Sequence, residues 1–220
     1  MSQGAGFEII PAVLTDAETD CVLTAVSASK RSRAGARHLM GDAVVSRLAR
    51  DRRLVGLASA ALGVPAQPYR ATLFEKSLVS NWLVVWHQDT ALPLEHRREA
   101  AGWGPWSTKA GVVYAHAPAS ALQRIVALRV HLDDSTSENG PLRVVPGSHE
   151  LGVLSDAEIQ ALIARERPHE CTVGRGGIVV MRPLLVHASS KAAIPASRRV
   201  LHLEYATTMS FAPDLRLRVA

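Results

Sequence analysis

Hydrophobic and polar positions fall into short runs over most of the chain after Pro65, a pattern typical of β-strands. The runs are rich in β-branched residues, and Gly, Pro, Asn and Ser separate them, as expected of turns. They occupy residues 69–76, 81–89, 124–134, 142–148, 169–173, 176–182, 184–190 and 198–206. Short strands in such a series indicate a sandwich or jelly roll rather than an alternating βαβ fold.

Three other segments predict helices. Two begin with a hydroxyl residue and a glutamate at the spacing of a capping box, and one ends at a glycine, a common C-terminal stop. The segments are residues 14–30 with Thr15 and Glu18, residues 46–63 ending at Gly63, and residues 154–166 with Ser155 and Glu158.

The composition is that of an ordinary globular protein, with 47% hydrophobic and 20% charged residues. We expect a single domain over residues 1–220, mainly β with packed helices: a helical part over about 1–65 and a jelly-roll core over about 66–210. No apolar run approaches the roughly 18 residues of a membrane span, and the first residues lack the features of a secretory signal. We therefore expect a cytoplasmic protein.

The chain carries a net charge of +5, which permits an anionic partner. Its arginines are scattered and are not interleaved with the aromatic residues that nucleic-acid binding requires, so we do not expect a nucleic-acid partner. A small anionic substrate would use the same charge equally well. Cys21 and Cys171 belong to no CxxC motif, and we expect two buried thiols rather than a disulfide or a zinc site.

One apolar run ends with His87 and Asp89, two positions apart. On a β-strand these side chains point to the same face, with Leu83 and Val85 behind them. Two imidazoles and one carboxylate on one side of a metal are the ligand set of non-haem iron(II) oxygenases, so a third ligand is needed from another strand. His187 is the best candidate, because it also ends an apolar run.

Eleven residues after His187, Arg198 opens the next strand, followed by Arg199. A guanidinium group near the metal could bind a dicarboxylate, because it pairs with a carboxylate through two hydrogen bonds. Only one of the two arginines can face the site, and a slip of one residue in register would exchange them.

The order of these residues resembles that of iron(II)- and 2-oxoglutarate-dependent dioxygenases and, within them, the phytanoyl-CoA dioxygenase family. The motifs WHQD, NGPLRVVPGSH and HASS, with the late arginine, match the family's order over about residues 70–206. The resemblance implies a double-stranded β-helix, a cupin-like jelly roll. It implies His87, Asp89 and His187 as iron ligands, and Arg198, Ser189 and Lys76 as contacts of 2-oxoglutarate.

The reaction implied by the resemblance uses O2 to convert 2-oxoglutarate to succinate and CO2 and hydroxylates an unactivated C–H bond of a small-molecule metabolite. Halogenating relatives replace the carboxylate ligand with a small residue. Because Asp89 is present, hydroxylation is favoured over halogenation. The alternative from another class of protein is a cupin-type protein that binds a metal or ligand without turnover, which would have no use for Arg198.

The sequence departs from the family at Arg129, where phytanoyl-CoA hydroxylases carry a tryptophan. Strand alternation would place Ala127, Arg129 and His131 on one face, so that Arg129 could bind an acidic substrate or 2-oxoglutarate itself. The chain is also short and offers no segment for coenzyme A. We therefore do not expect phytanoyl-CoA as the substrate.

Several other residues are candidates for the surroundings of the site. The glycine-rich segment 102–111 carries Trp103 and Trp106, which could form a lid over the substrate or seal the end of the barrel. Arg37 and His38 could border the site from the helical part. His202, on the strand of Arg198, could lie just behind the metal ligands, whereas His149 is expected to brace a turn.

Overall fold

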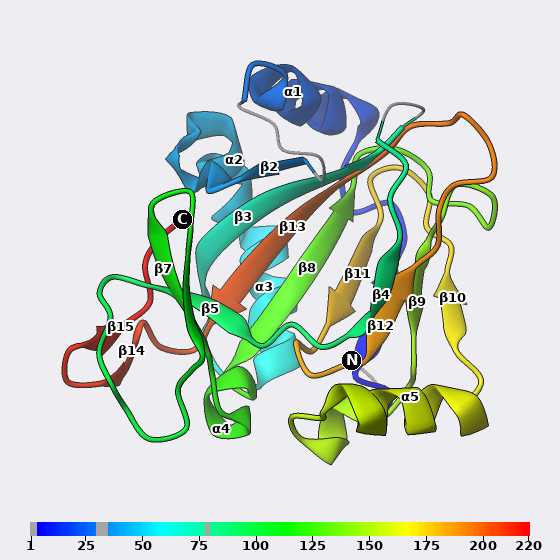
Figure 1. Cartoon of the computed structure of the whole chain (residues 1–220). Helices are drawn as coiled ribbons and strands as arrows, with labels where there is room; N and C mark the ends of the chain where they lie inside the picture. Colours follow the sequence, from blue (N-terminus) through cyan, green and yellow to red (C-terminus); the bar gives the residue numbers. More distant parts are fainter. Residues whose placement is uncertain (1–3, 30–34, 78–79) are drawn as a thin grey trace.

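The computed structural model describes residues 4–29, 35–77 and 80–220. Within them, two antiparallel sheets form the jelly roll that the sequence predicts (Figure 1). The six-stranded sheet contains, in spatial order, β1 (Phe7–Ile10), β11 (Ile178–Met181), β8 (Ile125–His131), β13 (Arg198–Ala206), β3 (Gln67–Lys76) and β2 (Gly35–Arg37). The four-stranded sheet contains β10 (His169–Cys171), β9 (Leu142–Val144), β12 (His187–Ser189) and β4 (Val84–His87).

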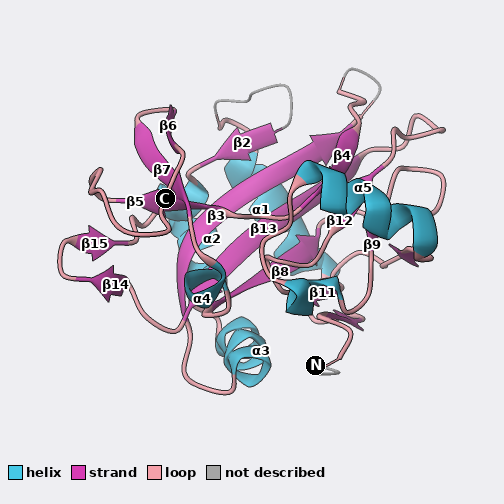
Figure 2. Cartoon of the chain, turned by 60° about the horizontal axis from the view of Figure 1, so that its bottom comes forward, coloured by secondary structure: helices cyan, strands magenta, loops and turns pink. Residues whose placement is uncertain are grey.

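Three helices cover the outer face of the six-stranded sheet (Figures 1 and 2): α1 (Asp16–Val26), α2 (Ala43–Ala49) and α3 (Arg52–Leu62). Strand β8 shows why the sheet is buried on both sides. Val126, Leu128 and Val130 point outward into the apolar cluster beneath the helices, whereas Arg129 and His131 point to the inside of the barrel. Each buried aliphatic side chain contributes roughly 1.5–3 kcal/mol to folding. Because the outer layer supplies this stabilisation, the inner face can carry polar residues.

The remaining elements close the barrel at its ends and edges. α5 (Asp156–Arg165) packs Ile159 and Leu162 against Val145 and Val186, on the outside of the four-stranded sheet. A three-stranded sheet is made of β5 (Ala91–Leu94), β7 (Val112–His116) and β6 (Trp106–Lys109), and α4 (Ala119–Leu122) follows it. The short elements are η1 (Leu39–Gly41), η2 (Ser148–Leu151), β14 (Ser210–Ala212) and β15 (Leu215–Arg216).

The predicted helices are confirmed, with one difference. Both capping boxes are present, and Gly63 ends α3 in the left-handed conformation. The segment 46–63 does not form one helix, because Asp51 adopts an extended conformation and caps the start of α3 with its side chain, which accepts a hydrogen bond from the Arg53 backbone. A good run of helix formers is thus divided in two.

All the predicted strands are present, but the sequence missed several short ones. Strands β1 and β2 lie in the part predicted to be helical, and β6 lies in the segment expected to be a loop. Each of these strands has only three or four residues, too few for a periodic pattern to emerge. The prediction for the cysteines is half right, because Cys171 is buried and Cys21 is exposed.

The helices of the described residues do not reach the length and hydropathy that a membrane-spanning helix requires.

Candidate active site

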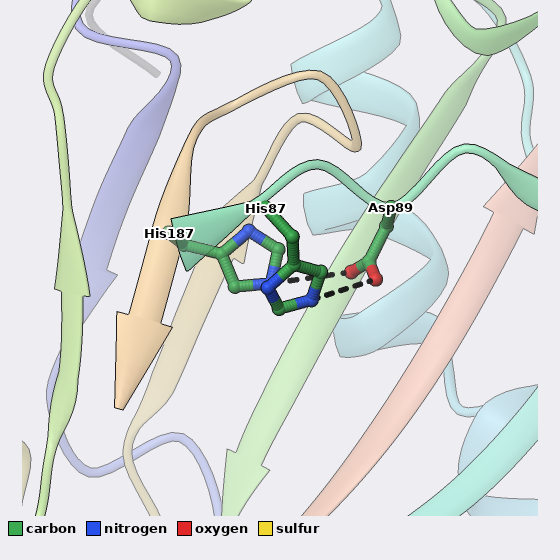
Figure 3. Close-up of side chains that lie close together, drawn as sticks. All are labelled: His87, Asp89 and His187. Atoms are coloured by element: carbon green, nitrogen blue, oxygen red, sulfur yellow. Dashed lines mark ion pairs between the residues drawn. The ribbon is translucent and has the colours of Figure 1, made fainter. Parts of the chain in front are cut away.

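Two histidines meet at the point where strands β4 and β12 pair. His87 ends β4, His187 begins β12, and the antiparallel register places them directly opposite each other, with ring centroids 4.2 Å apart. Asp89 completes the group (Figure 3): its carboxylate oxygens lie 3.7 Å from His87 Nε2 and 3.5 Å from His187 Nε2. One donor atom from each residue lies within 4.8 Å of the others. Metal–ligand bonds of about 2.1 Å hold neighbouring donors roughly 3 Å apart, so small shifts would let the three atoms share one ion.

The two imidazoles are oriented by backbone carbonyls that lie two residues earlier in the chain. His87 Nδ1 lies 2.8 Å from the Val85 carbonyl oxygen, and His187 Nδ1 lies 2.9 Å from that of Leu185. Because a carbonyl oxygen only accepts hydrogen bonds, each Nδ1 must carry a proton, and Nε2 is the ring nitrogen left to face Asp89 or a metal. This is the arrangement in which metal-binding histidines are fixed by a second hydrogen bond.

The predicted alternation along β4 is wrong, although His87 and Asp89 do converge. Leu83 and Val85 are 54% and 65% exposed instead of lying behind the histidine, and Val84 lines the cavity. The cause is a β-bulge: the pairing register shifts between the pair His87–His187 and the pair Val84–Ser189. An extra residue in β4 thus turns His87 inward.

Burial and neighbouring charges shift the pKa values of all three side chains. Burial lowers the pKa of His187 to about 3, so its ring is neutral at physiological pH. Removal from water would by itself raise the pKa of Asp89, but the adjacent His187 and His87 hold it well below its usual value. Burial alone would lower the pKa of His87, but its hydrogen bond to Asp89 and the charge of that carboxylate raise it above its usual value. The group therefore presents a carboxylate and the neutral imidazole of His187, and a metal would compete with a proton at His87.

A cavity of about 340 Å³ opens from this group and lies between the two sheets. The four-stranded sheet contributes residues such as His187 and Ser189, and the six-stranded sheet contributes Arg129 and Arg198. Apolar side chains complete the wall, namely Phe74, Trp82, Val84, Ala91, Leu142 and Ala188. The volume falls in the range of small-molecule sites.

At the deep end of the cavity, two cations converge on one serine. Arg198 and Lys76 are paired residues on β13 and β3, and both are almost completely buried. Lys76 Nζ donates to Ser189 Oγ at 2.6 Å and Arg198 Nη2 donates to it at 3.3 Å, while the serine hydroxyl donates to the Gly140 carbonyl at 2.8 Å. Lys76 also contacts the Ser190 carbonyl. Ser189 is thereby held in a single orientation.

These cations are not neutralised by the described residues around them. Buried Nε and Nη1 of Arg198 and buried Nε of Arg129 have no hydrogen-bond partner there. Burial, reinforced by the other arginines, lowers the pKa of Lys76 to about 7, and burial together with Arg129 lowers that of Arg198 to about 9. Free N–H groups and mutual repulsion in a buried chamber fit a ligand with carboxylate oxygens. The neighbouring Arg199 faces the other way and forms a 2.6 Å ion pair with Asp133.

The structure brings some of the other candidate residues to the cavity and leaves others outside it. Arg129 lines the cavity, with its guanidinium over the Phe74 ring and its Nη1 3.3 Å from His202 Nδ1. Trp103 and Trp106 do not line it; they pack on the cluster beside the three-stranded sheet. Arg37 lines the cavity from the end of β2.

Sequence reasoning missed several lining residues. Of these residues, Arg70 was the easiest to predict, because strand alternation places it on the same face of β3 as Phe74 and Lys76. Other missed residues include Thr90, Lys109 and His116, whose segments carry no strong pattern. Their approach to the cavity depends on how the three-stranded sheet folds back.

Comparison with known proteins agrees with this geometry. The family model for phytanoyl-CoA dioxygenase (PhyH) matches residues 3–200. The chain belongs to this family. The PhyH family consists of iron(II)- and 2-oxoglutarate-dependent dioxygenases, and the prediction made from the motifs is thus confirmed.

Individual relatives of this PhyH family member share less of its sequence or show low sequence identity. An L-proline trans-4-hydroxylase from Streptomyces griseoviridis is 35% identical over 129 residues, which make up 59% of this chain but only 39% of that protein. The crystal structure of AviO1 from Streptomyces viridochromogenes Tue57 has a TM-score of 0.67 at 24% identity, covering 94% of this chain and 92% of its own. HygX from Streptomyces hygroscopicus, with nickel and 2-oxoglutarate bound, has a TM-score of 0.68 at 18% identity, covering 94% and 84%. These two similarities establish the shared double-stranded β-helix.

Proposed function

We propose that this protein is an iron(II)- and 2-oxoglutarate-dependent dioxygenase that hydroxylates a C–H bond of a small, anionic metabolite. The proposal rests above all on Arg198, which is 3% exposed, has N–H groups with no partner among the described residues, and lines the same cavity as the three metal-type ligands. Membership of the PhyH family and a distant relative named as an L-proline hydroxylase support the same reaction class. The cavity of about 340 Å³ suits a small molecule.

In this proposal, His87, Asp89 and His187 hold iron, and their chemistry fits that metal. Two neutral imidazoles and one carboxylate leave coordination positions for 2-oxoglutarate and O2. When bound, iron and 2-oxoglutarate supply the oxidation, in which 2-oxoglutarate becomes succinate and CO2 and one oxygen atom enters the C–H bond. The carboxylate of Asp89 favours hydroxylation, because it leaves no vacant ligand position for a halide.

The far carboxylate of 2-oxoglutarate would bind Arg198 and Ser189. The Nε and Nη1 of this guanidinium have no partner among the described residues and can hold the carboxylate through two hydrogen bonds, while Lys76 fixes Ser189 in place. Arg129 lies in the same chamber beside His202. We therefore propose that Arg129 contacts the co-substrate rather than the substrate. Phe74, Trp82 and Leu142 would exclude water from the reacting atoms.

The deciding experiment is the anaerobic addition of Fe(II) and 2-oxoglutarate to the purified protein. We expect the weak visible charge-transfer band of the chelate, followed by succinate formation when O2 and a substrate from a metabolite library are admitted. A cupin-type protein that only binds metal would take up iron without the band, and this outcome would overturn the proposal. Charge-transfer spectra of Arg198→Gln and Arg199→Gln provide a matched pair of variants.

A further inference from the structure

A second set of cations lines the cavity, and Arg70 among them lies six residues along β3 from Lys76, the partner of Arg198. Arg37 ends β2, Arg70 lies on β3 and Lys109 ends β6, so three separate elements bring them to the space beside the metal-type ligands. We call these three residues the cationic wall. None of them is needed to hold iron or the far carboxylate of 2-oxoglutarate in the proposed function, and they are therefore free for the substrate.

The cationic wall is built around the ring of Tyr114. The guanidinium of Arg70 and the ammonium of Lys109 each lie 5.2 Å from the centre of this ring, an arrangement that favours their charged forms. The Tyr114 hydroxyl and His38 Nε2 are 2.9 Å apart, and the tyrosine is 1% exposed. The ring that both cations contact is thus fixed.

Among the described residues, a carboxylate pairs with only one of the three cations of this wall. Asp89 is the one acidic residue among the described residues that line the cavity, and it belongs to the metal-type group. Arg70 has a buried partner, Glu204, at 2.9 Å. Arg37 and Lys109 form no ion pair with a carboxylate of the described chain, and burial with repulsion from both arginines lowers the pKa of Lys109.

Iron and 2-oxoglutarate would leave this excess charge unchanged, because the two positive charges of the ion and the two negative charges of the co-substrate cancel. We propose that Arg37 and Lys109, with Arg70 behind them, bind an anionic group of the substrate, a carboxylate or a phosphate, and thereby hold its remaining part over the metal ligands. This inference rests on the proposed function. It assigns the substrate anion to the cationic wall instead of to Arg129.

The three cations differ in how they are held, and they therefore have different roles in anion binding. Arg70 is 14% exposed at its side chain and is held by Glu204, so it contributes a fixed positive field. Arg37 and Lys109 are exposed and unpaired within the described chain, and they can close on an anion without breaking an existing bond. Removal of either should therefore weaken anion binding while leaving the fold intact.

Anion binding can be tested before the substrate is known. The anaerobic protein is loaded with Fe(II) and saturating 2-oxoglutarate, and inorganic phosphate or acetate is titrated in by calorimetry while the charge-transfer band is recorded. We expect saturable binding in the wild type that weakens at least ten-fold in Arg37→Gln/Lys109→Gln. Arg37→Lys/Lys109→Arg should retain it, as should Arg167→Gln, which removes an exposed arginine outside the cavity.

Each result decides between the hypotheses. Tighter binding of phosphate than of acetate would indicate a phosphorylated substrate, and the opposite order a carboxylic acid. An intact band with no saturable anion binding, or with equal binding in the double glutamine variant, would overturn the cationic wall as an anion site. Absence of the band in the wild type would instead reject the proposed function.

Discussion

His87 and His187 are cross-strand partners whose rings are fixed in the same way, each Nδ1 donating a hydrogen bond to the carbonyl two residues earlier in the chain. Asp89 lies beyond the end of β4, yet its backbone is also tied to the segment before β12, because its N–H donates to the Pro183 carbonyl at 2.9 Å. Chain segments about a hundred residues apart in sequence are thereby locked at one point. The donor group is pre-organised, which lowers the cost of ordering it when metal binds.

Replacement of Asp89 by alanine should abolish the reaction. The variant loses the one anionic donor and keeps two neutral imidazoles, so we expect iron affinity to fall more than ten-fold and substrate-dependent succinate formation to cease. Anaerobic iron titration and succinate assays measure the two effects. Glu95→Gln removes an exposed carboxylate that pairs with Arg216 and should behave as the wild type. Full activity of Asp89→Ala would show that these residues are not the ligand set.

Adjacent arginines on β13 should differ sharply in their effect on 2-oxoglutarate. Arg198→Gln removes a buried charged donor, and hydrogen bonds to charged groups contribute about 1.5–3 kcal/mol, so the dissociation constant should rise roughly ten- to a hundred-fold. Arg199→Gln breaks an ion pair with Asp133 on the opposite face and should leave that constant unchanged. Titration of the charge-transfer band with 2-oxoglutarate gives both values. Equal effects in the two variants would contradict the assigned register.

The sequence was sufficient to predict the family and the residues that meet at the site, because its signals are local. His87 and Asp89 lie two residues apart, and Arg198 follows His187 at a fixed spacing, so both pairs are visible without the fold. The strands of the core were predictable for the same reason, since their β-branched runs are bounded by turn residues. Strand β13 was predicted with its exact bounds.

Other features depend on contacts that a local pattern does not encode. The bulge in β4 arises from its pairing with β12, and it reverses the facing predicted for Val85. Lys109 reaches the cavity only because β6 folds back along β7. Trp103 lies in a segment that looks like a lid, but its ring packs 5.5 Å from that of Phe211. These are tertiary effects, and they decide which side chains meet the substrate.

Binding of 2-oxoglutarate should take up a proton. Burial and the nearby Arg198 and Arg129 lower the pKa of Lys76 to about 7, so at about pH 8 this amine is largely neutral in the free protein. A bound carboxylate beside Ser189 would raise that pKa again and protonate the amine. The affinity should therefore decrease as the pH rises from about 7 to about 9, by up to roughly ten-fold per pH unit.

Calorimetry in two buffers of different ionisation enthalpy counts the protons taken up. In Lys76→Met both the proton uptake and its share of the pH dependence should disappear. Lys191→Met removes an exposed lysine and serves as the control. Binding by the wild type at about pH 8 without proton uptake would place the co-substrate away from Lys76.

The stability of the metal-free protein should fall in mild acid because of His131. This side chain is completely buried on β8, and burial together with Arg129 and Arg198 lowers its pKa to about 3, against an unfolded value of about 6.5. Between these values the unfolded chain binds the proton and the folded chain does not, so stability is present above about pH 6.5 and is lost as the pH falls. The loss from His131 between about pH 7.5 and pH 5 amounts to about 2 kcal/mol.

Other groups also titrate in this pH range, so a variant that lacks the His131 imidazole is needed to isolate the contribution of His131. Urea unfolding of the wild type and of His131→Gln at both pH values gives four free energies of unfolding, and the difference between the two pH effects belongs to His131. We expect the wild type to lose about 2 kcal/mol more than the variant. Equal losses would mean that His131 is protonated in the folded protein, and an imidazolium would then face Arg129 and Arg198 inside the barrel.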